Sequence, residues 1–124
     1  MDRQLLENIF VTAIEGGSNY WYFINNANHH KIRKAVPKSD DPYFATAMLS
    51  AILDHGVEVE VHDSENEDEV LGVLKLSDMD ERMKELDKNP NFMWALEAEE
   101  NGEGDAETSD IIFQYLVMGD VCFG

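Results

Sequence analysis

The chain has 124 residues, 44% hydrophobic and 10% aromatic, so it can bury a core and fold as one domain. Its 26 acidic and 9 basic residues give a net charge of −17, which argues against direct binding to nucleic-acid phosphates, because Lys and Arg supply that affinity. The single cysteine, Cys122, excludes an internal disulfide, and the absence of a long apolar run predicts a cytoplasmic, non-membrane protein.

The first element we expect is a helix that starts at the N-terminus, where no signal peptide is apparent, and reaches Ile14. Gly16 and Gly17 should end it, because glycine accepts the left-handed conformation that closes helices. The aromatic and β-branched run 19–24 then predicts a buried strand, and residues 25–39 a polar connection.

The middle of the chain predicts a helix followed by a hairpin. The sequence Asp40-Asp41-Pro42 is a helix start signal, and His55-Gly56 is a stop signal. Residues 57–62 alternate valines with polar residues, which predicts a strand whose exposed face carries Glu58, Glu60 and His62. Residues 57–76 therefore predict a hairpin, and Gly72 indicates a bulge or a close backbone approach in its second strand.

The last third is predicted to be helical. Ser77 and Asp80 resemble a capping box, and Asn89-Pro90 should end the helix that they begin. A short helix around 92–96, an acidic turn at 101–105 and a final helix from about Asp105 to Gly119 complete the chain. Residues 1–124 thus predict a single α+β domain in which four or five helices cover a small, mainly antiparallel sheet of about three strands.

Two segments, EGGSNYW at 15–21 and DAETSDIIFQYLVMGDVCFG at 105–124, together resemble the two ends of a group of small tailed-phage and prophage proteins. That group has the patterns E-G-G-x-x-Y-W and D-x-x-T-x-D, the latter followed by an apolar helix and F-G-[DE]-V-x-[FY]-G. Met118 stands at the Phe position of the second pattern. The positions that match it are Asp105, Thr108, Asp110, Gly119, Asp120, Val121, Phe123 and Gly124. The resemblance implies expression from a phage genome inside an infected or lysogenic bacterium, and it implies no particular activity.

The negative charge belongs to residues 39–124, which carry a net −19, whereas residues 1–38 carry a net +2. Carboxylates on a rigid scaffold can imitate a nucleic acid and occupy the groove of a protein that binds one. With the implied phage origin, this predicts a non-catalytic interaction protein, such as an anti-defence factor, that binds a host protein. The alternative is an acidic surface that only maintains solubility. The residues expected to bind the partner are Glu58, Glu60, Asp63, Glu65, Glu67, Asp68 and Glu69.

A second hypothesis is a small-molecule or nucleotide site in the aromatic segment, with aromatic rings stacked on a base and basic side chains on a phosphate. The competing interpretation places the rings in the core and leaves the basic segment as a solvated loop. The pair Gly16-Gly17 lacks the spacing of the known phosphate-binding loops. The residues of this alternative site are Ser18, Asn19, Tyr20, Trp21, Tyr22, Lys31 and Arg33.

The sequence contains no recognisable catalytic or metal-binding motif. It lacks G-x-S-x-G and H-E-x-x-H, and the adjacent His29 and His30 do not have the spacing of a helical zinc pair. An EF-hand loop starting at Asp63 would need glycine and glutamate where Asp68 and Leu74 stand. We therefore expect no cofactor, no metal and no catalytic residues.

Overall fold

The structure, a computed structural model, describes residues 2–124, which form a three-stranded antiparallel sheet of order β1-β2-β3 and six α-helices. The strands are β1 (Tyr22–Phe23), β2 (Val59–Asp63) and β3 (Val70–Leu74). The helices are α1 (Arg3–Thr12), α2 (Asn26–Ala35), α3 (Phe44–His55), α4 (Leu76–Asp87), α5 (Met93–Glu100) and α6 (Ala106–Met118). The predicted α+β class with a small antiparallel sheet is confirmed.

The first helix ends differently from the prediction. α1 is capped by the Asp2 side chain, which accepts a hydrogen bond from the Leu5 N–H, and it continues into a π-helical turn, η1 (Ala13–Gly17). Gly16 has a φ of 169°, an extended value, so the expected left-handed stop at this residue is wrong. The wider turn closes the helix instead, through the bond that the Ser18 N–H donates to the Ala13 carbonyl. A further turn follows, so the expected strand 19–24 shrinks to Tyr22–Phe23.

Helix α2 lies where we expected a polar connection, so that prediction is wrong. The Asn25 side chain caps the helix by accepting a hydrogen bond from the Asn28 N–H. Only Asn28 and Ile32 of this helix are buried, and its residues are mostly polar, so its composition resembles that of a loop. Asn28 also accepts a hydrogen bond from the Glu60 N–H of β2, which holds the polar helix against the sheet.

The hairpin is confirmed, with one correction on its exposed face. β2 and β3 pair antiparallel, with an irregular register between Val61 and His62. Gly72 is a close approach, as predicted, because a β-carbon there would overlap the carbonyl oxygen of Val117 in α6. His62, expected to be exposed, is buried, because its ring hydrogen-bonds to Asn25 and to the carbonyl of Glu67.

Two of the predicted helix ends are confirmed, and one predicted helix start is wrong. Gly56 and Gly119 end α3 and α6 in the left-handed conformation, with φ values of 64° and 73°. Asp105 and Thr108 form a capping box at the start of α6. The capping box expected at Ser77 is wrong, since α4 begins after Lys75 without a side-chain cap.

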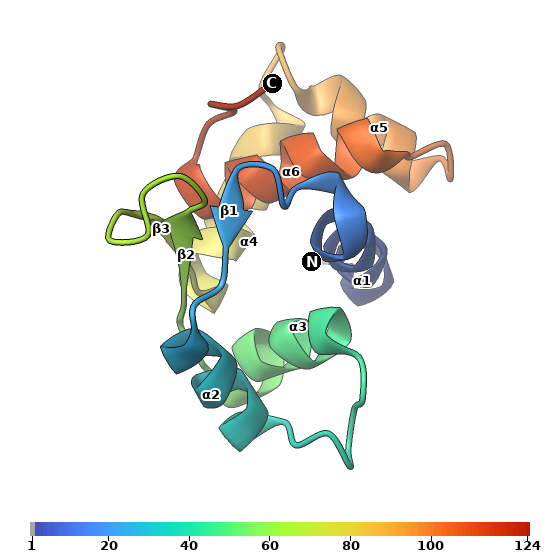
Figure 1. Ribbon diagram of the computed structural model, residues 1–124. Helices are drawn as coiled ribbons and strands as arrows, with labels where there is room; N and C mark the ends of the chain where they lie inside the picture. Colours follow the sequence, from blue (N-terminus) through green and yellow to red (C-terminus); the bar gives the residue numbers. More distant parts are fainter. Residues whose placement is uncertain (1) are drawn as a thin grey trace.

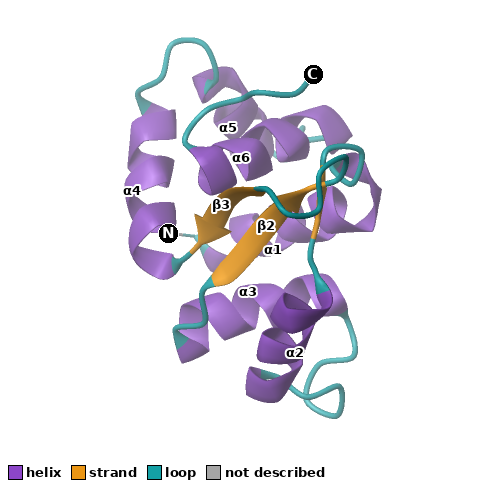
Figure 2. Cartoon of the chain, turned by 60° about the vertical axis from the view of Figure 1, so that its left-hand side comes forward, coloured by secondary structure: helices purple, strands orange, loops and turns teal. Residues whose placement is uncertain are grey.

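The elements are arranged around a core shared by α1, α3, α6 and the sheet (Figure 1). The views in Figures 1 and 2 both place α5 and α6 toward one end of the molecule and α2 and α3 toward the other. The strands lie between these two groups in Figure 2. The rings of Phe10 in α1 and Phe113 in α6 pack edge to face in the core, with 5.5 Å between their centroids. Within residues 2–124, no helix is long and apolar enough to cross a membrane.

Candidate functional site

The aromatic segment after α1 is anchored on a buried carboxylate, Asp110 of α6, which is 8% exposed. One oxygen, Oδ1, accepts hydrogen bonds from Ser18 Oγ at 2.6 Å and from Trp21 Nε1 at 2.8 Å. The other, Oδ2, accepts from Tyr20 Oη at 2.6 Å and from Gln114 Nε2 at 3.1 Å. Hydrogen bonds to an ionised acceptor are strong, so these four donors replace the water that burial removes. We call these five residues the Asp110 junction.

The junction also fixes the C-terminal tail. Gln114 Oε1 accepts hydrogen bonds from the backbone N–H groups of Cys122 and Phe123, at 3.0 and 2.9 Å. Gln114 Nε2 donates to the Phe123 carbonyl at 2.9 Å, and the Phe123 ring stacks on Trp21 at 5.5 Å. The segments 15–21 and 105–124, which carry the resemblance described above, therefore meet at one point in the fold.

The pKa values of two tyrosines, Tyr20 in the junction and Tyr22 close to it, are raised. Burial raises the pKa of Tyr20 to about 12, and the hydrogen bond to Asp110 and the charge of that carboxylate contribute further. Burial also raises the pKa of Tyr22, again with a smaller contribution from the charge of Asp110. At neutral pH the Tyr20 hydroxyl is therefore protonated and remains a hydrogen-bond donor to Asp110.

A hollow of about 490 Å³ opens beside the junction. We call it the Asp110 pocket. Its lining consists of Tyr20, Phe92, Ala106, Glu107, Asp110, Ile111, Val121, Phe123 and Gly124. Sequence reasoning singled out Tyr20 as a site residue but assigned no site to the others. Asp110 and Phe123 stand in the terminal pattern of the resemblance, which was the available signal, whereas nothing in the sequence brings Phe92 to the same place.

The acidic turn, residues 63–69, is held in a defined conformation next to the aromatic segment. Ser64 donates hydrogen bonds from its backbone N–H to the Trp21 carbonyl and from its hydroxyl to the Tyr20 carbonyl, both at 3.1 Å. His62 Nδ1 donates to the Glu67 carbonyl at 2.8 Å, and the Asp63 N–H donates to the Glu69 carbonyl at 3.0 Å. The aromatic segment is thus part of the scaffold that presents the acidic turn.

The carboxylates of the acidic turn face solvent without cationic neighbours. Glu65, Glu67, Asp68 and Glu69 are exposed, and Asp63 is half-buried. None of the ion pairs within residues 2–124 includes an acid of this turn. Glu58 lies just before β2 and is exposed. Glu60, within β2, is half-buried, and its Oε1 lies 3.5 Å from Nε2 of His62. The turn therefore presents concentrated, uncompensated negative charge.

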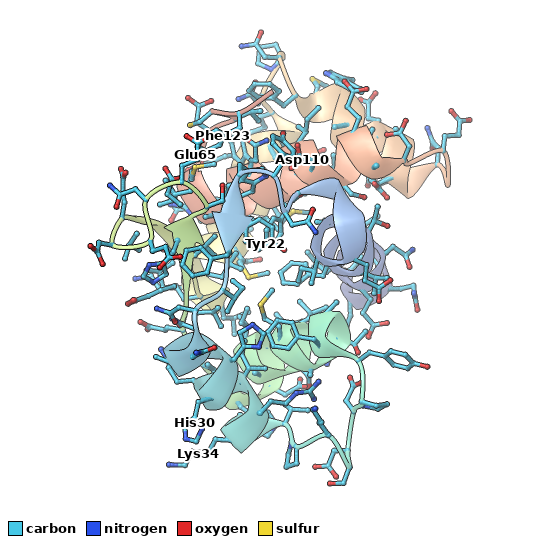
Figure 3. The ribbon with its side chains drawn as sticks, viewed as in Figure 1. Tyr22, His30, Lys34, Glu65, Asp110 and Phe123 are labelled. Atoms are coloured by element: carbon cyan, nitrogen blue, oxygen red, sulfur yellow. The ribbon has the colours of Figure 1, made fainter. Side chains whose placement is uncertain are left out.

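The structure does not bring the residues of the predicted nucleotide site together. The donors of Ser18 and Trp21 are bonded to Asp110, Tyr22 is buried and Asn19 is exposed. Lys31 is exposed on α2, and the Arg33 guanidinium donates to the carbonyls of Asp41 and Pro42. Figure 3 shows the basic helix, labelled at His30 and Lys34, at the opposite end of the molecule from Asp110.

The basic helix has its own packing role. The His29 ring stacks on Phe44 of α3, with 4.2 Å between ring centroids. Burial, followed by the charge of Arg33, lowers the pKa of His29, so its ring is neutral at neutral pH. His29 thus contributes to packing between α2 and α3, and His30 is exposed. Within the described residues, no group of three or more His, Cys, Asp or Glu side chains is placed to hold a metal ion.

A second hollow, of about 470 Å³, lies between α1 and the segment that joins α5 to α6. It is polar, and its lining includes Glu99, whose Oε1 accepts hydrogen bonds from Thr108 Oγ1 at 2.8 Å and from Ser109 Oγ at 2.7 Å. Those bonds tie α5 to the start of α6. This gives Glu99 a structural role.

No protein-family model, curated protein or solved structure matches the chain. The functional conclusion therefore depends on the geometry of the chain and on the chemistry of its surfaces.

Proposed function

We propose that this chain is a phage-derived, non-catalytic interaction protein that binds a host protein through the acidic turn, and that the partner is itself a nucleic-acid-binding protein. The observation that carries the proposal is the held conformation of a solvent-facing turn with five acids and no cationic neighbour. A fixed array of carboxylates can occupy a basic groove without first paying the entropy of ordering a loop.

The way the turn is anchored supports this proposal. Its hydrogen bonds lead to Tyr20 and Trp21, whose side chains end on Asp110 in α6. The positions of the carboxylates are therefore coupled to the core by a continuous set of contacts. A surface that served only solubility would not require such anchoring, because dispersed and mobile charges are sufficient for it.

The charge distribution also supports it. Figure 3 places Glu65 and the basic residues His30 and Lys34 at opposite ends of the molecule. At physiological salt, charges separated by more than about 8 Å of solvent are largely screened from one another. Within residues 2–124, no ion pair joins a base of α2 to an acid of the turn, so the turn keeps its negative charge for a basic partner.

The test is affinity capture from bacterial lysate at increasing salt, with the wild-type chain and two charge-reversal variants. The turn variant combines Glu58→Lys, Glu65→Lys, Glu67→Lys and Glu69→Lys. The control variant has the same net charge and combines Glu15→Lys, Glu81→Lys, Glu85→Lys and Asp87→Lys, all at exposed positions.

We expect the wild type to retain a specific host protein that dissociates as salt increases, because salt screens exposed charge pairs. The turn variant should bind that protein at least about tenfold more weakly, since like charges across an interface cost several kcal/mol. The control variant should bind almost as well as the wild type. Circular dichroism should show that both variants remain folded. Equal capture of the same protein by the wild type and the folded turn variant would contradict the proposal.

A further inference from the structure

We propose that the Asp110 pocket receives an arginine side chain of the host protein. This identification of the source of the arginine rests on the proposed function. The capacity of the pocket for a guanidinium group on an aliphatic stem follows from the charge and the lining of the pocket itself.

The charge of the pocket favours a cation. The lining contains two carboxylates, Asp110 and Glu107, and no Lys, Arg or His. Within residues 2–124 neither carboxylate belongs to an ion pair. A buried carboxylate normally has a cationic partner or a metal, but Asp110 has only neutral donors. The pocket is thus complementary to a cation that the chain itself does not supply.

The walls of the pocket suit an aliphatic stem that carries a planar cation. Ile111, Val121 and the rings of Phe92 and Phe123 provide apolar and aromatic surface. An aliphatic stem can pack against such walls, and a guanidinium group, which is weakly hydrated, stacks on aromatic rings more readily than an ammonium group does. An arginine side chain combines the stem and the planar cation that this lining favours.

The remaining hydrogen-bond acceptors determine how the cation would be held. A carboxylate offers about four acceptor positions, and those of Asp110 are occupied. Asp110 therefore attracts the guanidinium through its charge. Exposed Glu107 is free to accept hydrogen bonds from the guanidinium.

The location of the pocket connects it to the acidic turn. Tyr20, Phe123 and Gly124 also line a smaller hollow of about 240 Å³ that is bounded by Asp63, Ser64 and Glu65. The pocket and the acidic turn therefore lie on adjoining surface, on two sides of the C-terminal tail, and Figure 3 labels Phe123, Glu65 and Asp110 in the same region. A basic partner seated on the turn has the pocket within reach of its side chains.

The first experiment uses the free protein and the probe n-butylguanidinium, with n-butylurea as its neutral isostere. The readout is the NMR signal of the Trp21 indole N–H, which donates to Asp110 Oδ1, and the exposed Trp94 indole is the internal reference. We expect a saturable shift of the Trp21 signal with n-butylguanidinium, with a Kd on the order of a millimolar for so small a ligand. The urea should cause no saturable shift.

Two variants locate the binding. Glu107→Gln removes the charge at an exposed position of the lining and should weaken binding of the guanidinium at least threefold, whereas Glu100→Gln, at an exposed position outside the lining, should leave it unchanged. The pocket assignment is overturned if the Trp21 signal does not saturate, if the urea acts equally, or if Glu107→Gln binds the probe as the wild type does.

The second experiment tests the source of the arginine, through capture of the host protein by Glu107→Gln and by Glu100→Gln. We expect Glu107→Gln, but not Glu100→Gln, to capture the host protein more weakly than the wild type does. Equal capture of the host protein by the two variants would show that the pocket does not receive an arginine of the partner. The two proposals fail separately. If the turn variant no longer captures the host protein but the wild type does not bind the probe, only the pocket proposal is overturned. If the wild type binds the probe but the turn variant captures the host protein fully, only the proposed function is overturned.

Discussion

A carboxylate that is removed from water requires hydrogen bonds or a counter-ion, and Asp110 receives four hydrogen bonds from two parts of the chain, the segment after α1 and its own helix α6. Ser18, Tyr20 and Trp21 come from the segment after α1, and Gln114 extends the network to the tail. The Asp110 junction thus links the segment after α1 to α6 and, through Gln114, to the C-terminal tail. Substitution of Asp110 should affect the stability of the whole fold.

At the residue scale we predict that Asp110→Asn lowers the free energy of unfolding by about 2–4 kcal/mol. The NH2 group of the asparagine would face two hydrogen-bond donors, and the two hydrogen bonds to its remaining oxygen would no longer be strengthened by a negative charge. The measurement is unfolding in urea followed by Trp fluorescence. Asp87→Asn, at an exposed position of α4, is the matched control and should change stability by less than about 0.5 kcal/mol. Equal stability of the two variants would show that the junction contributes little.

The sequence allowed part of this site to be predicted. The resemblance identified segments 15–21 and 105–124, and the core interpretation of the aromatic run agrees with the burial of Trp21 and Tyr22. Local patterns cannot show that the Trp21 N–H meets Asp110, because that contact joins residues 89 positions apart. The Asp110 pocket was missed for the same reason, since its walls come from Phe92 just before α5, from α6, from the tail and from the aromatic segment.

At the scale of elements, the predictable parts are those with strong local signals. The first strand of the hairpin alternates polar and apolar residues, and α6 has a capping box and a left-handed glycine at its end. α2 was missed because only two of its residues are buried, and its stability comes from contacts with β2 and α3. The π-helical turn after α1 has no recognisable signal in the sequence.

A glycine governs the contact between the sheet and α6. We predict that Gly72→Ala lowers the free energy of unfolding by about 2–4 kcal/mol, since the added methyl group would overlap backbone atoms of Val117 and the backbone cannot move aside as a side chain can. Chemical unfolding measures the loss. Val70→Ala, on the same strand but exposed, is the control and should cost less than about 1 kcal/mol. A Gly72→Ala protein as stable as that control would contradict the close approach.

At the scale of the whole molecule, the distribution of charge is the dominant feature. Acids of the turn and of the pocket lie at one end, and the bases of α2 lie at the other (Figure 3). The sequence showed that residues 1–38 are net positive and residues 39–124 strongly negative, and in the fold His30 and Lys34 of α2 lie far from Glu65 and Asp110. Sequence could not show that the acidic turn is hydrogen-bonded to the aromatic segment, which makes the turn a fixed surface.

The most direct test of the proposed function is competition between the protein and DNA for the captured host partner, followed by the fluorescence anisotropy of a labelled duplex. If the acidic turn occupies the nucleic-acid groove, the wild-type chain should displace the duplex, and the folded turn variant should fail to displace it at concentrations at least about tenfold higher. Formation of a ternary complex, in which the partner holds the wild-type chain and the duplex together, would contradict the account.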